Sequence, residues 1–442
     1  MEKNKKIYIE TYGCQMNFSD SEIVISVLRE HGYEQTKEIK SADIVFLNTC
    51  SIREKAEQRV RKKLQNIRSL KKKNPDLVIG LLGCMANRTI TALAEEEQLL
   101  DVIAGPDSYR DLPRLLREAG TGQKAINTIL SADETYADIN PVRLDSGGVS
   151  AFISIMRGCE NYCAYCVVPS TRGVERSRDR ASILSETKDL FQKGYREVTL
   201  LGQNVNSYQW NFGKQIVPFH ELLESVASVD FGIRIRFATS HPKDLSDQLL
   251  LTIAAHENIC KSIHLPVQSG SNAMLDLMNR KYTREHYLDR ITAIRQLIPD
   301  CAISTDIITG FCNETERDHQ DTLSLMEKVG YDFSYMFKYS ERPRTLAAET
   351  LKDNVPSEVK ERRLKEVIAL QQKLSHQSNG RDVGKIFEIL IEGESKRSKA
   401  YFSGRNSQNK VVVFPKTSDI PGNYVNVKIS GFTSATLTGE IV

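Results

Sequence analysis

Three cysteines fall within eight residues of this chain, at Cys159, Cys163 and Cys166. Their spacing, C-x3-C-x2-C, is too tight and too irregular for a disulfide framework in a chain of this composition. It also lacks the fourth thiolate that closes a structural zinc site. Three thiolates on one loop suit a cubane iron–sulfur cluster in which one iron stays open to a small ligand. The spacing therefore predicts a catalytic cluster, and the alternative is a structural metal knuckle.

A second group of three cysteines is spread along the first hundred residues. Cys14, Cys50 and Cys84 each follow a short apolar run that predicts a β-strand, and helical patterns separate these runs. Strand–helix alternation indicates a parallel sheet whose strand ends share one edge. The three side chains are therefore expected to converge. One such cysteine would be read as a small buried hydrophobe, but three at equivalent strand ends favour a second cluster with an open iron.

Composition limits the classes of protein that this chain can be. Its 442 residues suffice for two to four domains, and a net charge of +3 means that nucleic-acid affinity must come from local patches. The first residues are polar without a signal-peptide pattern, and no apolar run reaches the length of a membrane span. Nine cysteines in such a protein point to metal or redox chemistry. A cytoplasmic location without a membrane partner is expected.

The predicted fold class is α/β with a small β-barrel at the end. A doubly wound domain is expected first, then a linker, then six strands alternating with helices that form a partial (β/α) barrel. Five short strands at the end of the chain predict the small C-terminal barrel. The boundaries are 5–120, 121–150, 151–378 and 380–442. In (β/α) barrels chemistry lies at the carboxyl ends of the strands, and the cysteine loop follows the first predicted barrel strand.

Polar residues at the other predicted strand ends are candidate cofactor contacts, although an ordinary loop role is equally open for each. These are Gln203, Asn204, Ser240, Gln268 and Asp306. Four arginines follow the cysteine loop and either bind phosphates or a carboxylate or form a solvated basic segment: Arg172, Arg176, Arg178 and Arg180.

Two basic segments are candidates for RNA contact. The predicted helix 59–73 has eight basic residues in fifteen. The C-terminal barrel places basic residues beside the pair Tyr401-Phe402; they are Lys396, Arg397, Lys399, Arg405 and Lys410. Basic side chains interleaved with aromatic ones suit RNA, and a solvated face is the alternative for both segments.

Several motifs together resemble those of the methylthiotransferase family of radical S-adenosylmethionine (SAM) enzymes, over nearly the whole chain. The motifs are Tyr12-Gly13-Cys14-Gln15-Met16-Asn17, Asn48-Thr49-Cys50-Ser51-Ile52-Arg53-Glu54-Lys55, Gly83-Cys84-Met85-Ala86, Val167-Val168-Pro169-Ser170-Thr171-Arg172-Gly173, Gly202-Gln203-Asn204-Val205-Asn206 and His264-Leu265-Pro266-Val267-Gln268. The resemblance implies a methylthiotransferase domain, a radical SAM core and a C-terminal TRAM domain. It also implies two [4Fe-4S] clusters as cofactors, one on each group of three cysteines, and SAM with Tyr165 against its adenine.

The resemblance also implies a reaction and its partners. A radical formed from SAM removes hydrogen from carbon 2 of N6-isopentenyladenosine next to the anticodon in tRNA, and a methylthio group is added with the use of two SAM. The Gln-Met-Asn and Ser-Ile-Arg-Glu-Lys elements favour this substrate over threonylcarbamoyl-adenosine or a ribosomal aspartate. The implied partners are the tRNA anticodon loop, an electron donor such as flavodoxin or ferredoxin, and a sulfur donor or iron–sulfur carrier. A monomer is expected.

Two departures from the family pattern put local geometry in doubt. Cys312-Asn313 stands where the family usually has Pro-Gly, and Arg344 stands where Gly is usual. Cys260, Cys301 and Cys312 are not expected to be ligands, because none has a second cysteine at ligand spacing. Two other functions stay open at this point: an iron–sulfur RNA-binding protein without catalysis, and an enzyme that modifies a protein side chain.

Overall fold

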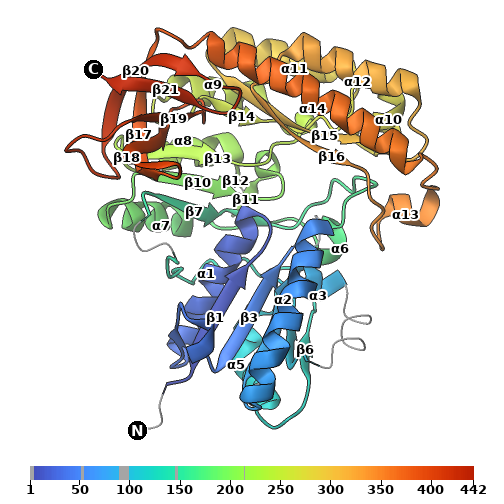
Figure 1. Ribbon diagram of the computed structural model, residues 1–442, viewed down its shortest axis with the longest axis vertical. Helices are drawn as coiled ribbons and strands as arrows, with labels where there is room; N and C mark the ends of the chain where they lie inside the picture. The colour runs from blue at the N-terminus through green and yellow to red at the C-terminus, as the bar shows by residue number, and fades with distance from the viewer. Residues whose placement is uncertain (1–3, 51–53, 89–98, 145–147, 214) are drawn as a thin grey trace.

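The computed structural model describes residues 4–442 except 51–53, 89–98, 145–147 and 214 (Figure 1). An N-terminal α/β domain packs against a partial (β/α) barrel, and a small β-barrel lies against the other side of that partial barrel. Within the described ranges, no helix combines the length and the apolar character needed to span a membrane.

The N-terminal domain is built on one six-stranded parallel sheet, in the order β2-β1-β3-β4-β5-β6. Its strands are β1 (Lys6–Thr11), β2 (Glu34–Gln35), β3 (Ile44–Thr49), β4 (Val78–Gly83), β5 (Val102–Ala104) and β6 (Ala125–Asn127). Its helices are α1 (Gln15–Glu30), α2 (Glu54–Lys73), α3 (Cys84–Arg88) and α5 (Leu112–Ala119), with short 3-10 turns at Ile39–Ser41 and Tyr109–Asp111. The doubly wound domain predicted from the sequence is thereby confirmed.

The predicted linker 121–150 is only partly a connection. β6 adds a strand to the sheet beside β5, and Tyr136 and Ile139 are buried in the core of the same domain. A strand of three residues has no periodic pattern, and the polar residues around it resemble a loop. The prediction was therefore wrong for much of this segment.

The central part of the chain contains the six parallel strands that were predicted. They are β7 (Ser150–Ser154), β10 (Glu197–Leu201), β13 (Arg234–Phe237), β14 (Ser262–His264), β15 (Ala302–Thr309) and β16 (Phe333–Lys338). Hydrogen bonds group them into two sheets, β7-β10-β13 and β14-β15-β16. The sheets meet where the Ser240 N–H donates to the carbonyl of His264, at 3.2 Å. β14 is shorter than predicted because Pro266 follows it and Gln268 has a left-handed backbone, with φ of 72°.

Helices cover the outside of the partial barrel, and α14 closes it beyond β16 (Figure 1). The helices are α6 (Val168–Arg172), α7 (Arg180–Gln192), α8 (Phe219–Ala227), α9 (Asp247–Ala255), α10 (Asn272–Leu277), α11 (Arg284–Leu297), α12 (Glu316–Val329), α13 (Leu346–Thr350) and α14 (Ser357–Gly380). Two short antiparallel pairs complete this part: β8 (Met156–Arg157) with β9 (Arg176–Ser177), and β11 (Gln209–Phe212) with β12 (Gln215–Pro218). Turns of 3-10 helix lie at Val205–Ser207 and Pro242–Asp244.

The C-terminal barrel is closed, with strand order β17-β18-β19-β21-β20. Its strands are β17 (Ile386–Ser395), β18 (Ser398–Arg405), β19 (Val411–Pro415), β20 (Tyr424–Phe432) and β21 (Leu437–Ile441). It packs on the first residues of the barrel strands: Arg234 forms an ion pair with Glu388 at 2.9 Å, and Arg236 donates to the carbonyl of Asn406 at 2.8 Å.

The aromatic and basic residues predicted to contact RNA on this barrel do not all face solvent. Tyr401 is exposed, but Phe402 is buried in the barrel core, because neighbouring strand residues point to opposite faces. Lys410 is paired with Asp382 at 2.7 Å, and Arg405 with Glu392 at 3.1 Å. The exposed basic residues here are Lys396 and Arg397, in the turn between β17 and β18, and Lys399, near the start of β18.

Candidate active site

Cys14, Cys50 and Cys84 lie side by side because they follow β1, β3 and β4, which are neighbours in the sheet. Cys14 precedes the first residue of α1, and Cys84 is the first residue of α3. The loop before Cys14 is pressed against Cys50: Gly13 has φ of 117°, and a Cβ there would lie 2.2 Å from the Cβ of Cys50. Glycine is therefore required next to the first cysteine.

The surroundings of this group favour an ionised sulfur at Cys14. A hydrogen bond with Cys50 is the main cause that lowers the pKa of Cys14, to about 6, and the nearby guanidinium of Arg172 adds to it. Burial raises the pKa of Cys84, while Arg172 acts in the opposite direction. Arg172 belongs to α6 of the partial barrel. A cation of the central part therefore lowers the pKa of Cys14 and Cys84 in the N-terminal domain. Motif residues Ser51-Ile52-Arg53, beside Cys50, lie outside the described residues.

Cys159, Cys163 and Cys166 lie on the loop between β8 and α6, at the carboxyl side of the first barrel strand. Each sulfur accepts a hydrogen bond: from Asn161 to Cys159 at 3.5 Å, from the Val168 N–H to Cys166 at 3.5 Å, and from Arg280 to Cys163 at 3.2 Å. Burial raises the pKa of Cys159 to about 11 and that of Cys166 to about 12. Three donors aimed at three sulfurs suit thiolates that bind a cluster.

Arg280 is a site residue that sequence reasoning missed. Its buried guanidinium donates to Cys163, to the hydroxyl of Tyr165 at 3.3 Å and to the carbonyl of Pro266 at 2.6 Å. The ring of Tyr165 packs edge-on against Phe311, with centroids 6.5 Å apart. Nothing in the local sequence distinguishes Arg280 from the surface cations around it, because its burial depends on a loop more than a hundred residues earlier.

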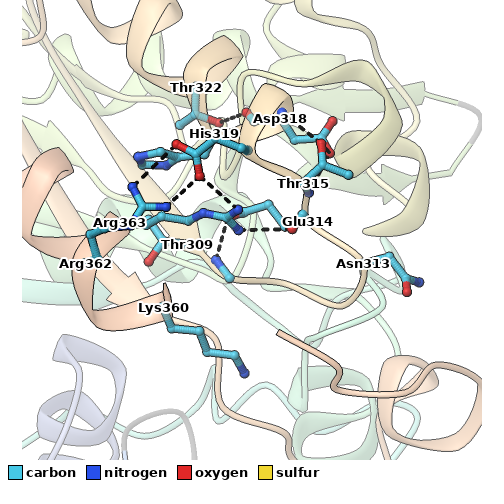
Figure 2. A network of polar contacts seen from close by, with 12 residues as sticks. Thr309, Asn313, Glu314, Thr315, Asp318, His319, Thr322, Lys360, Arg362 and Arg363 are labelled. Atoms are coloured by element: carbon cyan, nitrogen blue, oxygen red, sulfur yellow. Dashed lines mark hydrogen bonds and ion pairs between the residues drawn. The ribbon is translucent and has the colours of Figure 1, made fainter. Parts of the chain in front are cut away.

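The loop that carries Phe311 is fixed by a polar network with α14 (Figure 2). The carboxylate of Glu314 accepts from the Gly310 N–H at 2.9 Å and from Arg363 at 2.8 Å. Thr315 and Asp318 form a capping box at the start of α12. The network therefore holds the loop after β15, and with it the aromatic contact to Tyr165.

The same network includes Glu316, His319 and Glu366, whose possible ligand atoms all lie within 4.8 Å of one another. Arg362 forms ion pairs with Glu316 at 2.6 Å and with Glu366 at 2.7 Å. The carboxylates are thus already paired with a cation, and the group is an ion-pair network joining α12 to α14.

The two departures from the family pattern keep the backbone that glycine usually provides. Asn313 has φ of 64° and Arg344 has φ of 62°, in the left-handed region that asparagine tolerates better than most residues. Cys312 is buried in an apolar cluster with Phe311, where it packs as a small apolar side chain. Arg344 donates to the carbonyl of Asn87 on the N-terminal domain, at 3.1 Å.

The arginines after the cysteine loop join the two domains. Asp20 of α1 is fully buried and accepts from Arg157 at 2.9 Å and from Arg172 at 2.7 Å. Arg176 forms an ion pair with Asp107 at 3.0 Å.

A second group of ion pairs is centred on Glu186. Arg178 forms an ion pair with Glu186, and Arg143 forms ion pairs with both Glu22 and Glu186. The solvated alternative is therefore wrong for Arg172, Arg176 and Arg178, whose partners are carboxylates of the chain itself.

A cavity of about 1380 Å³ runs from the first cysteine group through the interior of the partial barrel to the C-terminal barrel. Cys14 and Cys50 line it at one end and Arg405 and Lys410 at the other. Of the predicted cofactor contacts, Asp306 lines it, and its carboxylate lies 3.5 Å from Nε2 of His264. The space is large enough for a nucleoside with neighbouring groups.

The other predicted cofactor contacts lie outside the lining of this cavity. They are Tyr165, Gln203, Asn204, Ser240 and Gln268. Asn204 donates to Asp244 at 2.7 Å, and Ser240 donates to Asn206 at 3.1 Å. The side-chain oxygens of Gln203 and Asn204 are buried without a hydrogen-bond partner among the described residues. Such oxygens fit a polar ligand that binds at these strand ends.

Comparison with known proteins connects this geometry to named families. Residues 6–105 match Uncharacterized protein family UPF0004, residues 153–326 the Radical SAM superfamily, and residues 380–442 the TRAM domain. A protein of Amoebophilus asiaticus named tRNA-2-methylthio-N(6)-dimethylallyladenosine synthase is 58% identical, covering 99% of this chain and 92% of that protein. A protein of the same name from Parabacteroides distasonis is 56% identical, with 99% and 96% covered.

A solved structure supports the fold over most of the chain. The radical S-adenosylmethionine methyltransferase TsrM from Kitasatospora setae matches with a TM-score of 0.58 and 14% identity, covering 78% of this chain and 75% of that one. At this identity the likeness concerns the fold alone.

Proposed function

This chain belongs to the family of tRNA-2-methylthio-N(6)-dimethylallyladenosine synthases, and from that premise we propose how its residues divide the work. It is a radical SAM enzyme that adds a methylthio group to carbon 2 of N6-isopentenyladenosine, also called dimethylallyladenosine, in tRNA. SAM and a [4Fe-4S] cluster are its cofactors. The observation that carries the proposal is the presence of two three-cysteine groups tied together by one buried ion network.

We propose that Cys159, Cys163 and Cys166 hold the cluster that works with SAM, and that Cys14, Cys50 and Cys84 hold a second, auxiliary [4Fe-4S] cluster. When bound, these groups supply the reductive cleavage of SAM and the sulfur that is transferred, with two SAM used per product. Arg280 donates to the sulfur of Cys163 and braces Tyr165, so it orients the loop that faces SAM. Gln203, Asn204, Ser240, Gln268 and Asp306 are proposed as polar contacts to SAM or substrate.

The chain's own residues also set where the reaction takes place. Asp20, Arg157 and Arg172 fix the N-terminal domain against the barrel, so the two cysteine groups keep one relative position. The cavity beside Cys14 accepts the reacting base, which must be turned out of its RNA loop to enter.

We propose the remaining partners on chemical grounds. The target is the base next to the anticodon, and the exposed basic residues of the C-terminal barrel contact tRNA phosphates. A flavodoxin or ferredoxin supplies electrons, and a sulfur donor or iron–sulfur carrier replaces the sulfur that is consumed. The enzyme acts in the cytoplasm, as a monomer.

The test is anaerobic turnover by cluster-reconstituted protein with SAM and a reductant. We expect 5′-deoxyadenosine together with methylthiolated tRNA, identified by nucleoside mass spectrometry, and no product on ribosomal protein. SAM cleavage without any modified nucleoside would contradict the assigned substrate. Absence of SAM cleavage in fully loaded protein would instead favour an iron–sulfur RNA-binding protein.

A further inference from the structure

Arg172 of α6 is a buried cation beside the first cysteine group. Its Nη2 donates to the side-chain oxygen of Asn17 at 3.1 Å and to the carboxylate of Asp20 at 2.7 Å. Its other terminal nitrogen, Nη1, is buried and has no hydrogen-bond partner among the described residues. Because a buried donor without a partner costs free energy, this nitrogen indicates a ligand that the chain itself does not supply.

The guanidinium of Arg172 acts on the sulfurs of the cysteine group. After the hydrogen bond with Cys50, its charge contributes to the lowered pKa of Cys14. Burial raises the pKa of Cys84, and Arg172 opposes this mainly through its charge and to a smaller extent through contact with the thiol. Helix α6 also packs against α3, which begins at Cys84. The guanidinium therefore lies near both sulfurs, and Nη1 remains available as a donor.

The cations around Arg172 outnumber the carboxylates that contact them. Three buried arginines share two buried carboxylates; they are Arg157, Arg172 and Arg176 with Asp20 and Asp107. Each of these five side chains is at most 3% exposed. A buried charge is costly unless an opposite charge lies near it. The neighbouring cysteines, as thiolates that hold a cluster, would supply the negative charge that this group lacks.

The other two arginines direct their contacts elsewhere. The guanidinium of Arg157 lies over the ring of Tyr136, 4.9 Å from its centroid, and donates to the carbonyl of Pro106 at 3.1 Å. Arg176 donates to the carbonyl of Arg172 at 3.1 Å. In both of them the buried atom without a hydrogen-bond partner is Nε, which has one N–H, whereas in Arg172 it is Nη1, which has two.

We infer that Nη1 of Arg172 donates to a sulfur of the cluster held by Cys14, Cys50 and Cys84 and thereby raises the reduction potential of that cluster. This inference rests on the proposed function. A cubane held by three thiolates carries a net negative charge, which grows on reduction. Net charge and hydrogen bonds to the sulfurs set the potential of such clusters, so a buried cation that also donates favours the reduced state. The barrel thus completes a cofactor site of the other domain.

The first experiment detects the contact itself. It uses full-length protein in which Cys159, Cys163 and Cys166 are replaced by Ala, so that the auxiliary cluster is observed alone. The arginines are labelled with ¹⁵N in their guanidinium groups, and the cluster is reduced by irradiation at low temperature, which does not depend on its potential. Pulsed EPR should show a ¹⁵N coupling to the cluster. The coupling should be lost in Arg172→Lys and retained in Arg157→Lys.

The second experiment measures the potential by redox titration monitored by EPR, in the same background. Arg172→Lys should shift the potential of the cluster to a more negative value, because the donor fork is lost while the charge is kept. Arg172→Gln should shift it further, because the charge is lost as well. Arg157→Gln also removes a cation from Asp20 but should leave the potential unchanged, so it separates an effect on the cluster from a weakened domain contact.

Each outcome decides the inference. Absence of a ¹⁵N coupling in the protein that keeps Arg172 would overturn it, even where the Arg172 variants fail to fold. Equal shifts of the potential by Arg172→Gln and Arg157→Gln would overturn it as well, because they would indicate a purely structural role. If iron analysis finds no cluster on Cys14, Cys50 and Cys84, the two-cluster assignment under the proposed function fails first, and the inference falls with it.

Discussion

The two cysteine groups of this enzyme are built in opposite ways. One takes all its members from a single loop between β8 and α6, where each sulfur accepts one hydrogen bond. The other collects one cysteine from each of three neighbouring strand ends and depends on the whole sheet for its shape. Their electrostatics differ in the same sense: the pKa of Cys14 is lowered to about 6, whereas that of Cys166 is raised to about 12.

A cysteine site formed by one loop and a cysteine site formed by a whole sheet are therefore sensitive to different changes. The loop site needs local donors and burial, so changes near it act on the sulfurs directly. The site formed by the sheet requires the N-terminal domain to remain packed against the partial barrel. The reason is that Arg172, which contacts Asp20 and lies near Cys84, belongs to the partial barrel.

The largest effect should come from replacing Cys159, Cys163 and Cys166 together by Ala. SAM cleavage should be abolished, and iron in reconstituted protein should fall from roughly eight per chain to about half. Iron analysis and 5′-deoxyadenosine measurement test this. Continued SAM cleavage by this variant would show that the loop does not hold the cluster that cleaves SAM. Cys260→Ala serves as a control, because that buried cysteine belongs to neither group.

Replacing Cys14, Cys50 and Cys84 by Ala should separate the two activities. 5′-Deoxyadenosine should still form, because the loop site is intact, but methylthiolated nucleoside should disappear. Iron should again fall to about half. Methylthiolation at the wild-type rate by this triple variant would show that the three cysteines have only a structural role.

Alkylation of cluster-free protein should show the electrostatic contrast directly. The thiolate is the reactive form, so at about pH 7 Cys14 should react with iodoacetamide and Cys166 should not, although both are half-buried. A thiol with a pKa of about 6 is protonated below that pH, so labelling of Cys14 should fall as the pH drops through this value. Peptide mass spectrometry measures both sites.

A matched pair of variants sharpens the alkylation test. Cys50→Ala removes the hydrogen bond that is the main cause of the lowered pKa, so labelling of Cys14 should shift to higher pH. Cys301→Ala should have no effect, because that cysteine is buried in the barrel core. Equal labelling of Cys14 and Cys166 at all pH values would contradict the difference between their pKa values.

Asp20→Asn should weaken the attachment of the N-terminal domain. The change removes the closest carboxylate partner of buried Arg157 and Arg172 and leaves Arg157 only Asp107, at 3.7 Å. Loss of one partner from a buried ion pair typically costs about 3–5 kcal/mol. Denaturant unfolding should show the loss, and methylthiolation should fall more than SAM cleavage. The exposed ion pair of Lys193 with Asp189 provides the control: Asp189→Asn should change stability by less than about 1 kcal/mol. Equal stability of the Asp20 variant would contradict the role of this network.

The smallest effect concerns the C-terminal barrel, which belongs to neither cysteine group. Replacing Lys396, Arg397 and Lys399 by Ala should weaken tRNA binding and lower its salt slope by roughly 0.7 to 0.9 for each phosphate that is no longer neutralised. SAM cleavage should stay unchanged. Binding at several salt concentrations tests this, with Lys328→Ala on α12 as the control. An unchanged slope would make the basic helix α2 the better candidate for the tRNA interface.

The sequence was sufficient where chemistry is local or periodic. The spacing of Cys159, Cys163 and Cys166 is informative by itself, and the strand pattern predicted the six barrel strands. It also predicted the placement of three cysteines at neighbouring strand ends, because parallel strands share an edge. The segments it misjudged are short: β2 and β6 have two and three residues and no periodicity.

Pairings over long separations could not be predicted. Asp20 and Arg157 are 137 residues apart, and Arg280 and Cys163 are 117 apart. No pattern in one sequence says which arginine becomes buried and which stays in solvent, since burial follows from the docking of whole domains. The same limit applies to Phe402, whose neighbour Tyr401 faces solvent: both fit a strand, and register decides which one packs inside.

The buried carboxylate of Asp20 has a consequence for biosynthesis. The last strand of the N-terminal sheet, β6, precedes Arg157 and Arg172 in the chain, and domains tend to fold in the order in which they are made. Until those arginines arrive, α1 must expose to solvent the side that carries Asp20 and Asn17, both fully buried in the finished enzyme. We therefore expect this side of α1 to stay exposed in the nascent chain for as long as synthesis of the segment up to Arg172 takes.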